Sequence, residues 1–387
     1  GRVVRTYAME ESTYGTAGVL AATDAVRALS GFAINSNPRN RVDSPERHTY
    51  PSQIYRFTRK RTASFNFPGI FYPSGTLNTL PDHTPFLKNG MGAVTNVTIA
   101  ATVLTAASTP AEAAPTTTAF AITDIGALVV GDAVLINATT GGRQVRWITA
   151  IAAAAGVAPK KLITVAPALS NAPILSDSVK GCITYKLATA LPASLDIAAY
   201  LTSHSFEGLG CVVDNLKFNF DSNDECRWSA SGPAQTRSRN AQADPATFTA
   251  VGTTPPSGLT GGLRVGAAAE ETVKFSIEIQ NAMALDDKPF GISQAQGFYR
   301  RGKRKVLVSI DEVQSNDVSI LTLAEDTTDT VLLYQQGLTE GSIIACYAPA
   351  VELDVPDFGD SDEEMMRSYK GVCKGVAGND EVYLSLA

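Results

Sequence analysis

Short runs in which apolar and polar residues alternate recur along most of the chain, and this pattern constrains the fold more than any other feature. Typical examples are RTASFNF (61–67), NLKFNF (215–220) and TVKFSIEI (272–279), and clusters of Gly, Pro, Asn and Asp separate such runs. A period of two residues is typical of β-strands with one buried face and one polar face. We therefore expect a mainly β protein.

Phenylalanine and asparagine alternate in the first two of these runs, which predicts the face on which each side chain lies. The asparagines Asn66 and Asn219 are expected on the polar face, and the phenylalanines on the buried one. The residues expected to be buried are Phe65, Phe67, Phe218 and Phe220.

Helix signals are few. Thr84 is a candidate N-cap of a short helix, with Pro85 in its first position and Gly90 just past its end. A second short helix is expected in SILTLAED, capped by Ser319 or Asp317.

Composition excludes several classes of protein. With 387 residues, of which 44% are hydrophobic and 18% charged, the chain can bury a sizeable core and suits two or three domains. The net charge of −6 argues against a tight nucleic-acid binder, because such proteins are usually basic. The sequence contains no run of about 20 apolar residues that would span a bilayer, and no secretory signal is visible. We expect no membrane association, and synthesis in a cytoplasm.

The residues that carry most enzyme chemistry are scarce. There are three histidines, and none has an acid or a nucleophile at motif spacing. Asp357-Phe358-Gly359 matches a kinase tripeptide but lacks the loops that accompany it. The acids of 221–225 lack the glycine and the terminal glutamate of a calcium loop. The sequence therefore predicts no enzyme, no catalytic residue, no metal and no cofactor.

The cysteines show no CxxC spacing, which argues against a zinc site. We expect reduced thiols that fill space in the core. The alternative is an inter-subunit disulfide. The cysteines are Cys182, Cys211, Cys226, Cys346 and Cys373.

Two pairs of segments resemble each other and occur in the same order. YRFTRKRTASFNF (55–67) and YRRGKRKVLVSID (299–311) both begin Tyr-Arg, carry a basic cluster and continue as a strand. NLKFNFDSNDECRWSASG (215–232) and AVELDVPDFGDSDEEMMRSYKG (350–371) both run from a strand through an acidic turn into a second strand. This repeat predicts two similar β-domains in tandem.

The first repeat is much longer than the second, and the excess falls in residues 95–187. This segment begins with an Ala/Thr-rich stretch and continues with a compact β pattern. We interpret it as a small inserted β-domain, expected on the outer surface because exposed loops accept insertions best. The predicted domains are a discontinuous first domain, the insertion, a Pro/Gly/Thr-rich linker and a second domain: 1–94 with 188–243, then 95–187, 244–270 and 271–387.

Several passages resemble the tail tube (major tail) proteins of tailed bacteriophages, in the version that carries two tube domains in one chain. The N-terminal stretch, the short helix, the later basic passage and the last strand follow that family's order, while the inserted segment lies outside the resemblance. The passages are TYGTAGVLAATDAVRALSGFAINSNP (13–38), HTPFLKNGMGA (83–93), ALDDKPFGISQAQGFYRRGKRKVLVSIDE (284–312) and GNDEVYLSLA (378–387).

The resemblance implies β-sandwich or barrel-like domains that form rings stacked around a DNA-conducting lumen. It implies a protein of the virion tail, with further copies of itself as the main partner. Other implied partners are the tape measure, terminator and distal tail proteins, and double-stranded DNA that passes through the lumen without specific binding. With two tube domains per chain, a ring is expected to contain three chains.

Charged clusters are the candidate contacts between subunits, because complementary patches set register and partner choice. A solvated face and direct contact with DNA phosphates are the alternative interpretations. The candidate basic residues are Arg56, Arg59, Lys60, Arg61, Arg300, Arg301, Lys303, Arg304 and Lys305. The candidate acidic residues are Asp221, Asp224, Glu225, Asp360, Asp362, Glu363 and Glu364.

Two further functions stay open on the sequence alone. One is a distal tail or baseplate adaptor that has the same fold but forms a single ring. The other is a carbohydrate-binding module in which Trp147 and Tyr185 of the insertion stack on a sugar.

Overall fold

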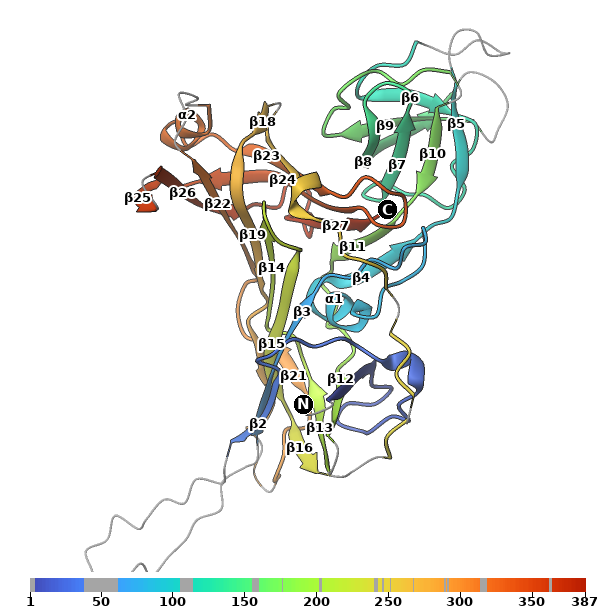
Figure 1. Ribbon diagram of the computed structural model, residues 1–387. Coiled ribbons are helices and arrows are strands. Elements are labelled where there is room, and N and C mark those ends of the chain that lie inside the picture. Colours follow the sequence, from blue (N-terminus) through green and yellow to red (C-terminus); the bar gives the residue numbers. More distant parts are fainter. Residues whose placement is uncertain are drawn as a thin grey trace, which may run out of the picture.

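The computed structural model is mainly β. Strands account for 51% of the residues and helices for 6%, which confirms the fold class expected from the alternating pattern (Figure 1). The structure describes residues 4–37, 62–104, 114–154, 160–175, 177–201, 204–239, 243–245, 247–250, 252–266, 268–288, 290, 292–313, 319–361 and 364–387.

Eight strands form one long antiparallel sheet, which we call the wall. It extends from β25 at one end to β2 at the other (Figure 1), and every neighbouring pair in it is antiparallel. In spatial order the strands are β25 (Asp357–Ser361), β26 (Glu364–Cys373), β22 (Lys305–Val313), β19 (Thr272–Gln280), β14 (Asn215–Asp221), β15 (Arg227–Ala234), β3 (Thr62–Ile70) and β2 (Ala33–Asn37).

The wall has one buried face and one polar face. Along β3 and β14 the burial alternates residue by residue, and Asn66 and Asn219 are exposed. Phe65, Phe67, Phe218 and Phe220 are each at most 3% exposed, so the predicted assignment of faces is confirmed. The polar face is available for contacts outside the chain.

Two further sheets cover the buried face. The first packs on the half of the wall that contains β2 and β3, and consists of β1 (Arg5–Glu10), β12 (Leu195–Leu201), β13 (His204–Cys211) and β16 (Thr236–Arg239). The second is continuous with the wall through β24, and consists of β18 (Ala268–Glu270), β17 (Gly262–Val265), β23 (Thr330–Gln336), β24 (Ile344–Leu353), β27 (Tyr383–Leu386), β11 (Ile183–Leu187) and β4 (Gly92–Asn96). A single apolar core runs between the layers of both halves. The segment expected as a linker, 244–270, includes β17 and β18, of which β17 pairs with β23.

The described residues include two short α-helices, α1 (Thr84–Met91) and α2 (Ser319–Glu325). The boundaries predicted for α1 were wrong by one and two residues. His83 occupies the N-cap position, and Gly92 ends the helix in the left-handed conformation with φ of 108°. A glycine is favoured there because a Cβ would be strained at positive φ. The minor elements are η1 (Ala22–Asp24), η2 (Gly258–Thr260), and the hairpin of β20 (Met283–Leu285) and β21 (Phe298–Arg300).

The predicted small β-domain is a closed six-stranded barrel with its own apolar core. The chain enters it from β4 and leaves it into β11, which pair with each other so that Asn96 lies opposite Ile183. The barrel lies on the side of the molecule away from the wall (Figure 1). Its strands are β5 (Ala100–Leu104), β6 (Ala119–Ile122), β7 (Ala133–Ala138), β8 (Gly142–Ala153), β9 (Lys161–Ala166) and β10 (Ser178–Gly181).

All five cysteines are free and buried, as expected for core-filling thiols.

Candidate assembly surfaces

The two outer strands of the wall are the first candidate surface. Within the described chain, β2 pairs only with β3, and β25 pairs only with β26. One side of each outer strand therefore carries backbone N–H and C=O groups without a strand partner. Exposed edges are commonly protected by Lys or Pro, but β2 reads AINSN and β25 reads DFGDS. Both edges can accept a further strand.

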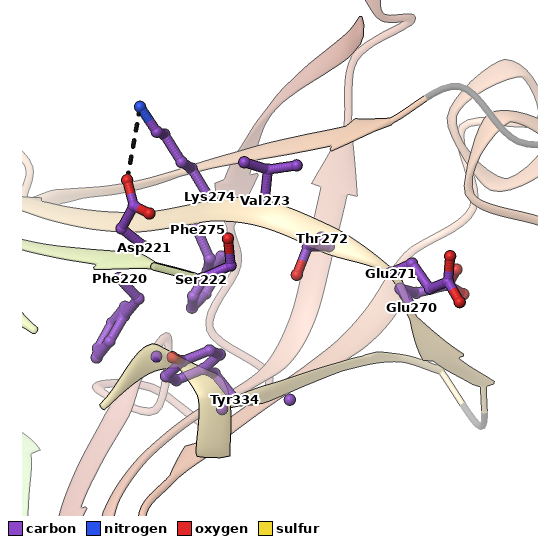
Figure 2. A pocket seen from close by; sticks show the side chains of 13 residues that line it. Phe220, Asp221, Ser222, Glu270, Glu271, Thr272, Val273, Lys274, Phe275 and Tyr334 are labelled. Carbon is purple, nitrogen blue, oxygen red and sulfur yellow. Dashed lines mark ion pairs between the residues drawn. The ribbon is translucent and has the colours of Figure 1, made fainter. Parts of the chain in front are cut away.

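The polar face of the wall is the second candidate surface. Where β14, β19 and β22 lie side by side it is hollowed, with a volume of about 430 Å³. Asp221 Oδ2 lies 3.6 Å from Lys274 Nζ across this face. Figure 2 shows the pair pointing away from Phe220 and Tyr334, whose rings pack in the core 4.3 Å apart. The face thus presents charged groups that already neutralise each other.

Other carboxylates on the polar face also have partners within the chain. Glu278 Oε1 accepts hydrogen bonds from Asn215 Nδ2 at 2.6 Å and from Gln280 Nε2 at 2.7 Å. Asp311 Oδ1 accepts one from Ser368 Oγ at 2.6 Å. The face is polar and mixed in sign, without a stripe of cations along one strand.

The predicted basic cluster before β22 separates into buried and exposed members. The side chain of Arg304 is 6% exposed and donates to Ala188 O at 3.1 Å, Asn379 Oδ1 at 3.0 Å and Glu381 Oε2 at 3.2 Å. Arg304 therefore holds the chain together internally, and its side chain is not available to a neighbour. Charge reversal at Arg304 is expected to destabilise the fold.

The other members of this cluster lie nearer the surface. Arg301, Lys303 and Lys305 are exposed. Arg300 is half-buried, and burial followed by the charge of Arg304 lowers its pKa. The exposed members are the ones that can contact another subunit.

The acidic turn between β14 and β15 is held by one arginine. Arg227 Nη2 lies 2.6 Å from Asp224 Oδ2 and 3.3 Å from Glu225 Oε1. Hydrogen bonds with the Glu225 side chain and backbone, with a smaller contribution from the charge of Arg227, lower the pKa of Asp224. Arg227 is exposed and both acids are only half-buried, so the ion pairs contribute little to stability and can exchange partners.

The remaining candidate residues lie on β25, on β26 or outside the described residues. Asp360 belongs to β25 and Glu364 begins β26. Six others lie outside the described residues: Arg56, Arg59, Lys60, Arg61, Asp362 and Glu363.

Strand register places the described acidic and basic clusters at opposite ends of the strands of the wall, along the strand direction and not at its outer strands β2 and β25. Asp221 is paired with Lys274, and Lys274 in turn with Asp311, near the end of β22. At the other end of the same strands, Gln280 is paired with Lys305. The acidic turn and the exposed basic residues are thus separated by the length of a strand.

The face between barrel and body is closed by aromatic packing. Trp147 of β8 is 1% exposed and stacks on Tyr347 of β24, with ring centroids 5.0 Å apart. Tyr185 is fully buried and bonds to Thr84. Neither ring can stack on a sugar, so the proposed role of these two residues in a carbohydrate-binding module was wrong. The alternation of apolar and polar residues in the sequence does not indicate that Trp147 points out of the barrel and packs on the sheet that contains β24.

No metal centre or membrane helix is found in the described part of the chain. Its His, Cys, Asp and Glu side chains form no group of three or more that could hold a metal ion. Neither described helix has the length and apolarity that crossing a membrane requires.

Comparison with protein-family models identifies a family. The model of a protein family described as phage tail tube protein matches residues 1–369. No curated protein matches the chain.

Proposed function

Because the chain belongs to the phage tail tube family, we propose that it polymerises into stacked rings that form the conduit for DNA ejection. Family membership makes it a structural protein of the virion tail. The observation that carries the proposal is the wall, an open antiparallel sheet whose two outer strands, β2 and β25, each have one edge without a strand partner in the described chain.

The strand directions in the wall support closure of a ring. The wall contains an even number of strands, all alternating in direction, so its first and last strands run antiparallel to each other. When copies are related by rotation about an axis, β2 of one chain meets β25 of the next in antiparallel orientation. Head-to-tail contacts of this kind close into a ring, and a closed sheet has no unpaired edge.

The order of elements supports two tube domains per chain. In sequence, β2, β3, α1, β14 and β15 correspond to β19, β22, α2, β25 and β26. In space, each set of four strands has the same arrangement: β2-β3-β15-β14 and β19-β22-β26-β25. The first pair of resembling segments falls on corresponding strands, β3 and β22. In the second pair the match is partial: 215–232 covers β14 and β15, whereas 350–371 begins in β24 and its acidic stretch forms β25 before β26. We infer that three chains supply six similar positions around the ring.

Stacking of rings is the role we assign to the separated charges. The acidic turn with Asp224 and Glu225 lies at one end of the strands of the wall, and the exposed Arg301 and Lys303, just before β22, lie at the opposite strand end. When rings stack head to tail, the acidic end of one faces the basic end of the next. Complementary ends favour one stacking direction and speed association.

The polar face of the wall is proposed to line the lumen. Its apolar face is already covered by two sheets, and its carboxylates already have partners within the chain. On the part of this face that the structure describes, DNA phosphates would meet no concentrated positive charge, which suits passage without specific binding. The barrel, on the side away from the wall, then lies on the outside of the tube. The tape measure, terminator and distal tail proteins are the remaining proposed partners.

Electron microscopy of the purified full-length chain tests the proposal. We expect long cylinders of uniform diameter at high protein concentration. Single rings that never stack would favour a distal adaptor instead, and a protein that stays monomeric under all conditions would contradict assembly through its own edges.

A further inference from the structure

A cavity of about 250 Å³ lies where the barrel meets the body. The barrel contributes Gln144, Arg146 and Ser170, and β17 contributes Arg264. Two positively charged side chains from different parts of the fold therefore face one small space.

Arg146 is unusual because its charge is buried and none of the described residues gives it an acidic partner. It is 2% exposed, and its partners in the described chain are Ala168 O at 3.2 Å, Val145 O at 2.7 Å and Gln144 Oε1 at 2.7 Å. All three acceptors are neutral. A guanidinium has five N–H donors, so donors remain for a further acceptor.

The second arginine joins the same hydrogen-bonded chain. Arg264 donates to Ser170 Oγ at 2.9 Å. The Ser170 hydroxyl and backbone N–H both donate to Gln144 Oε1, at 3.3 and 3.0 Å, which also accepts from Arg146. The polar groups around the cavity are thus fixed in place before any ligand enters.

Electrostatics around the cavity favour an anion. A buried charge without an opposite charge is costly. Burial, followed by the charge of Arg264, lowers the pKa of Arg146 to about 9. An oxyanion would offset both effects, since planar guanidinium groups match carboxylate and phosphate oxygens well.

We infer that the cavity bounded by Arg146, Arg264 and Ser170 is a binding site for one oxyanion of the phosphate or carboxylate type. Because Arg146 belongs to the barrel and Arg264 to the body, the bound anion links the two. The ligand has two possible sources, a free phosphate ion or an acidic side chain of a neighbouring copy in the assembled tube.

The test is a titration of the unassembled full-length chain with inorganic phosphate at constant ionic strength, with chloride as the reference. Calorimetry should give one site per chain, and phosphate should raise the melting temperature more than chloride does. Arg146→Met and Arg264→Met should each weaken binding by about tenfold or more, as expected for loss of a charge-assisted pair. Arg143→Met is the matched control, since Arg143 lies on β8 like Arg146, is exposed and donates to Leu338 O. The affinity of this variant for phosphate should equal that of the wild type.

A second measurement distinguishes the two sources. If assembled tubes bind phosphate as the free chain does, the ligand is a free anion; if only the unassembled chain binds it, a neighbour's acid fills the site in the tube. The inference is overturned if phosphate and chloride act alike on the wild-type chain, or if either cavity variant binds phosphate as tightly as the Arg143 control. Because Arg264 is less buried than Arg146, its variant keeps the test decisive should Arg146→Met fail to fold.

Discussion

The wall and the barrel are both antiparallel β structures, but only the barrel closes on itself. The six strands of the barrel pair around a complete circle, and its core is separate from that of the body. Among the described residues, each of the two outer strands of the wall has one partner. A closed sheet has no free edge and needs no partner from another chain. The edges of an open sheet are satisfied only when strands of a neighbouring chain pair with them. Changes to the wall should therefore affect assembly far more than changes to the barrel.

The largest effect is expected from proline at the edge of the wall. Asn35→Pro and Ser36→Pro, as single variants in β2, each remove one backbone N–H. Because successive N–H groups of a strand point to opposite sides, one variant removes a donor that faces outward, towards the proposed neighbour. That variant should melt close to the wild type but form no cylinders in the electron microscope.

The control for this experiment is another edge of the molecule. Proline at Ala268 or Ala269 disturbs β18, which pairs only with β17 and takes no part in the proposed ring contact. Cylinders should persist. If the β18 variants stop assembly and the β2 variants do not, the wrong edge has been assigned to the ring.

A smaller effect on assembly is expected from the charged residues at the two ends of the strands of the wall. Arg301→Glu with Lys303→Glu should slow assembly at low salt by about tenfold, because steering by complementary charge mainly changes association rates, and light scattering will measure this rate. Adding Asp224→Lys and Glu225→Lys to this double variant should restore the rate of assembly. Lys160→Glu with Lys161→Glu, on the barrel, gives the same change in net charge and should have no effect.

Arg304 separates stability from assembly in the same region. The side chain of Arg304 is 6% exposed and forms an ion pair with Glu381. Arg304→Ala should therefore lower the free energy of unfolding by about 2 kcal/mol. This loss is smaller than for a fully buried ion pair because Glu381 is partly exposed. Arg301→Ala should change it by less than about 0.5 kcal/mol. Equal losses of stability in chemical denaturation would contradict the internal role given to Arg304.

Removing the barrel should have little effect on tube formation. Asn96 and Ile183 lie opposite each other in an antiparallel pair, so deletion of residues 97–182 can be bridged by a two-residue Asn-Gly turn. Leu333 and Tyr347, which pack against the barrel, should be changed to threonine to keep the uncovered surface soluble. Folded protein that no longer forms cylinders would show that the barrel takes part in the ring.

The smallest effect is expected from thiol chemistry. All five cysteines are buried and free, and burial raises the pKa of Cys373 to about 12 and that of Cys226 well above its usual value. Few thiolates are therefore present at neutral pH. Native protein should react with a thiol reagent only slowly, and preformed cylinders should survive reductant. Collapse of the cylinders would show that disulfides join the subunits.

The sequence predicted those parts of the molecule that depend on local patterning. Alternation identified the buried phenylalanines of β3 and β14, and the composition change at 95–187 identified the small barrel. The role of Trp147 was missed because a strand that contacts a core on one side and another sheet on the other has no polar face to mark it. Arg304 looked like its exposed neighbours in sequence, because its partners Ala188 and Glu381 are distant along the chain and only the tertiary fold brings them together.

The symmetry of the assembled ring tests the central claim most directly. A three-dimensional reconstruction of the cylinders by cryo-electron microscopy should show three chains per ring, with the walls joined from β2 to β25 into one closed sheet. The barrels should appear as three projections on the outside, because each chain carries one barrel but two similar halves of the wall. Six equivalent chains per ring, or walls whose outer strands stay unpaired, would contradict this account.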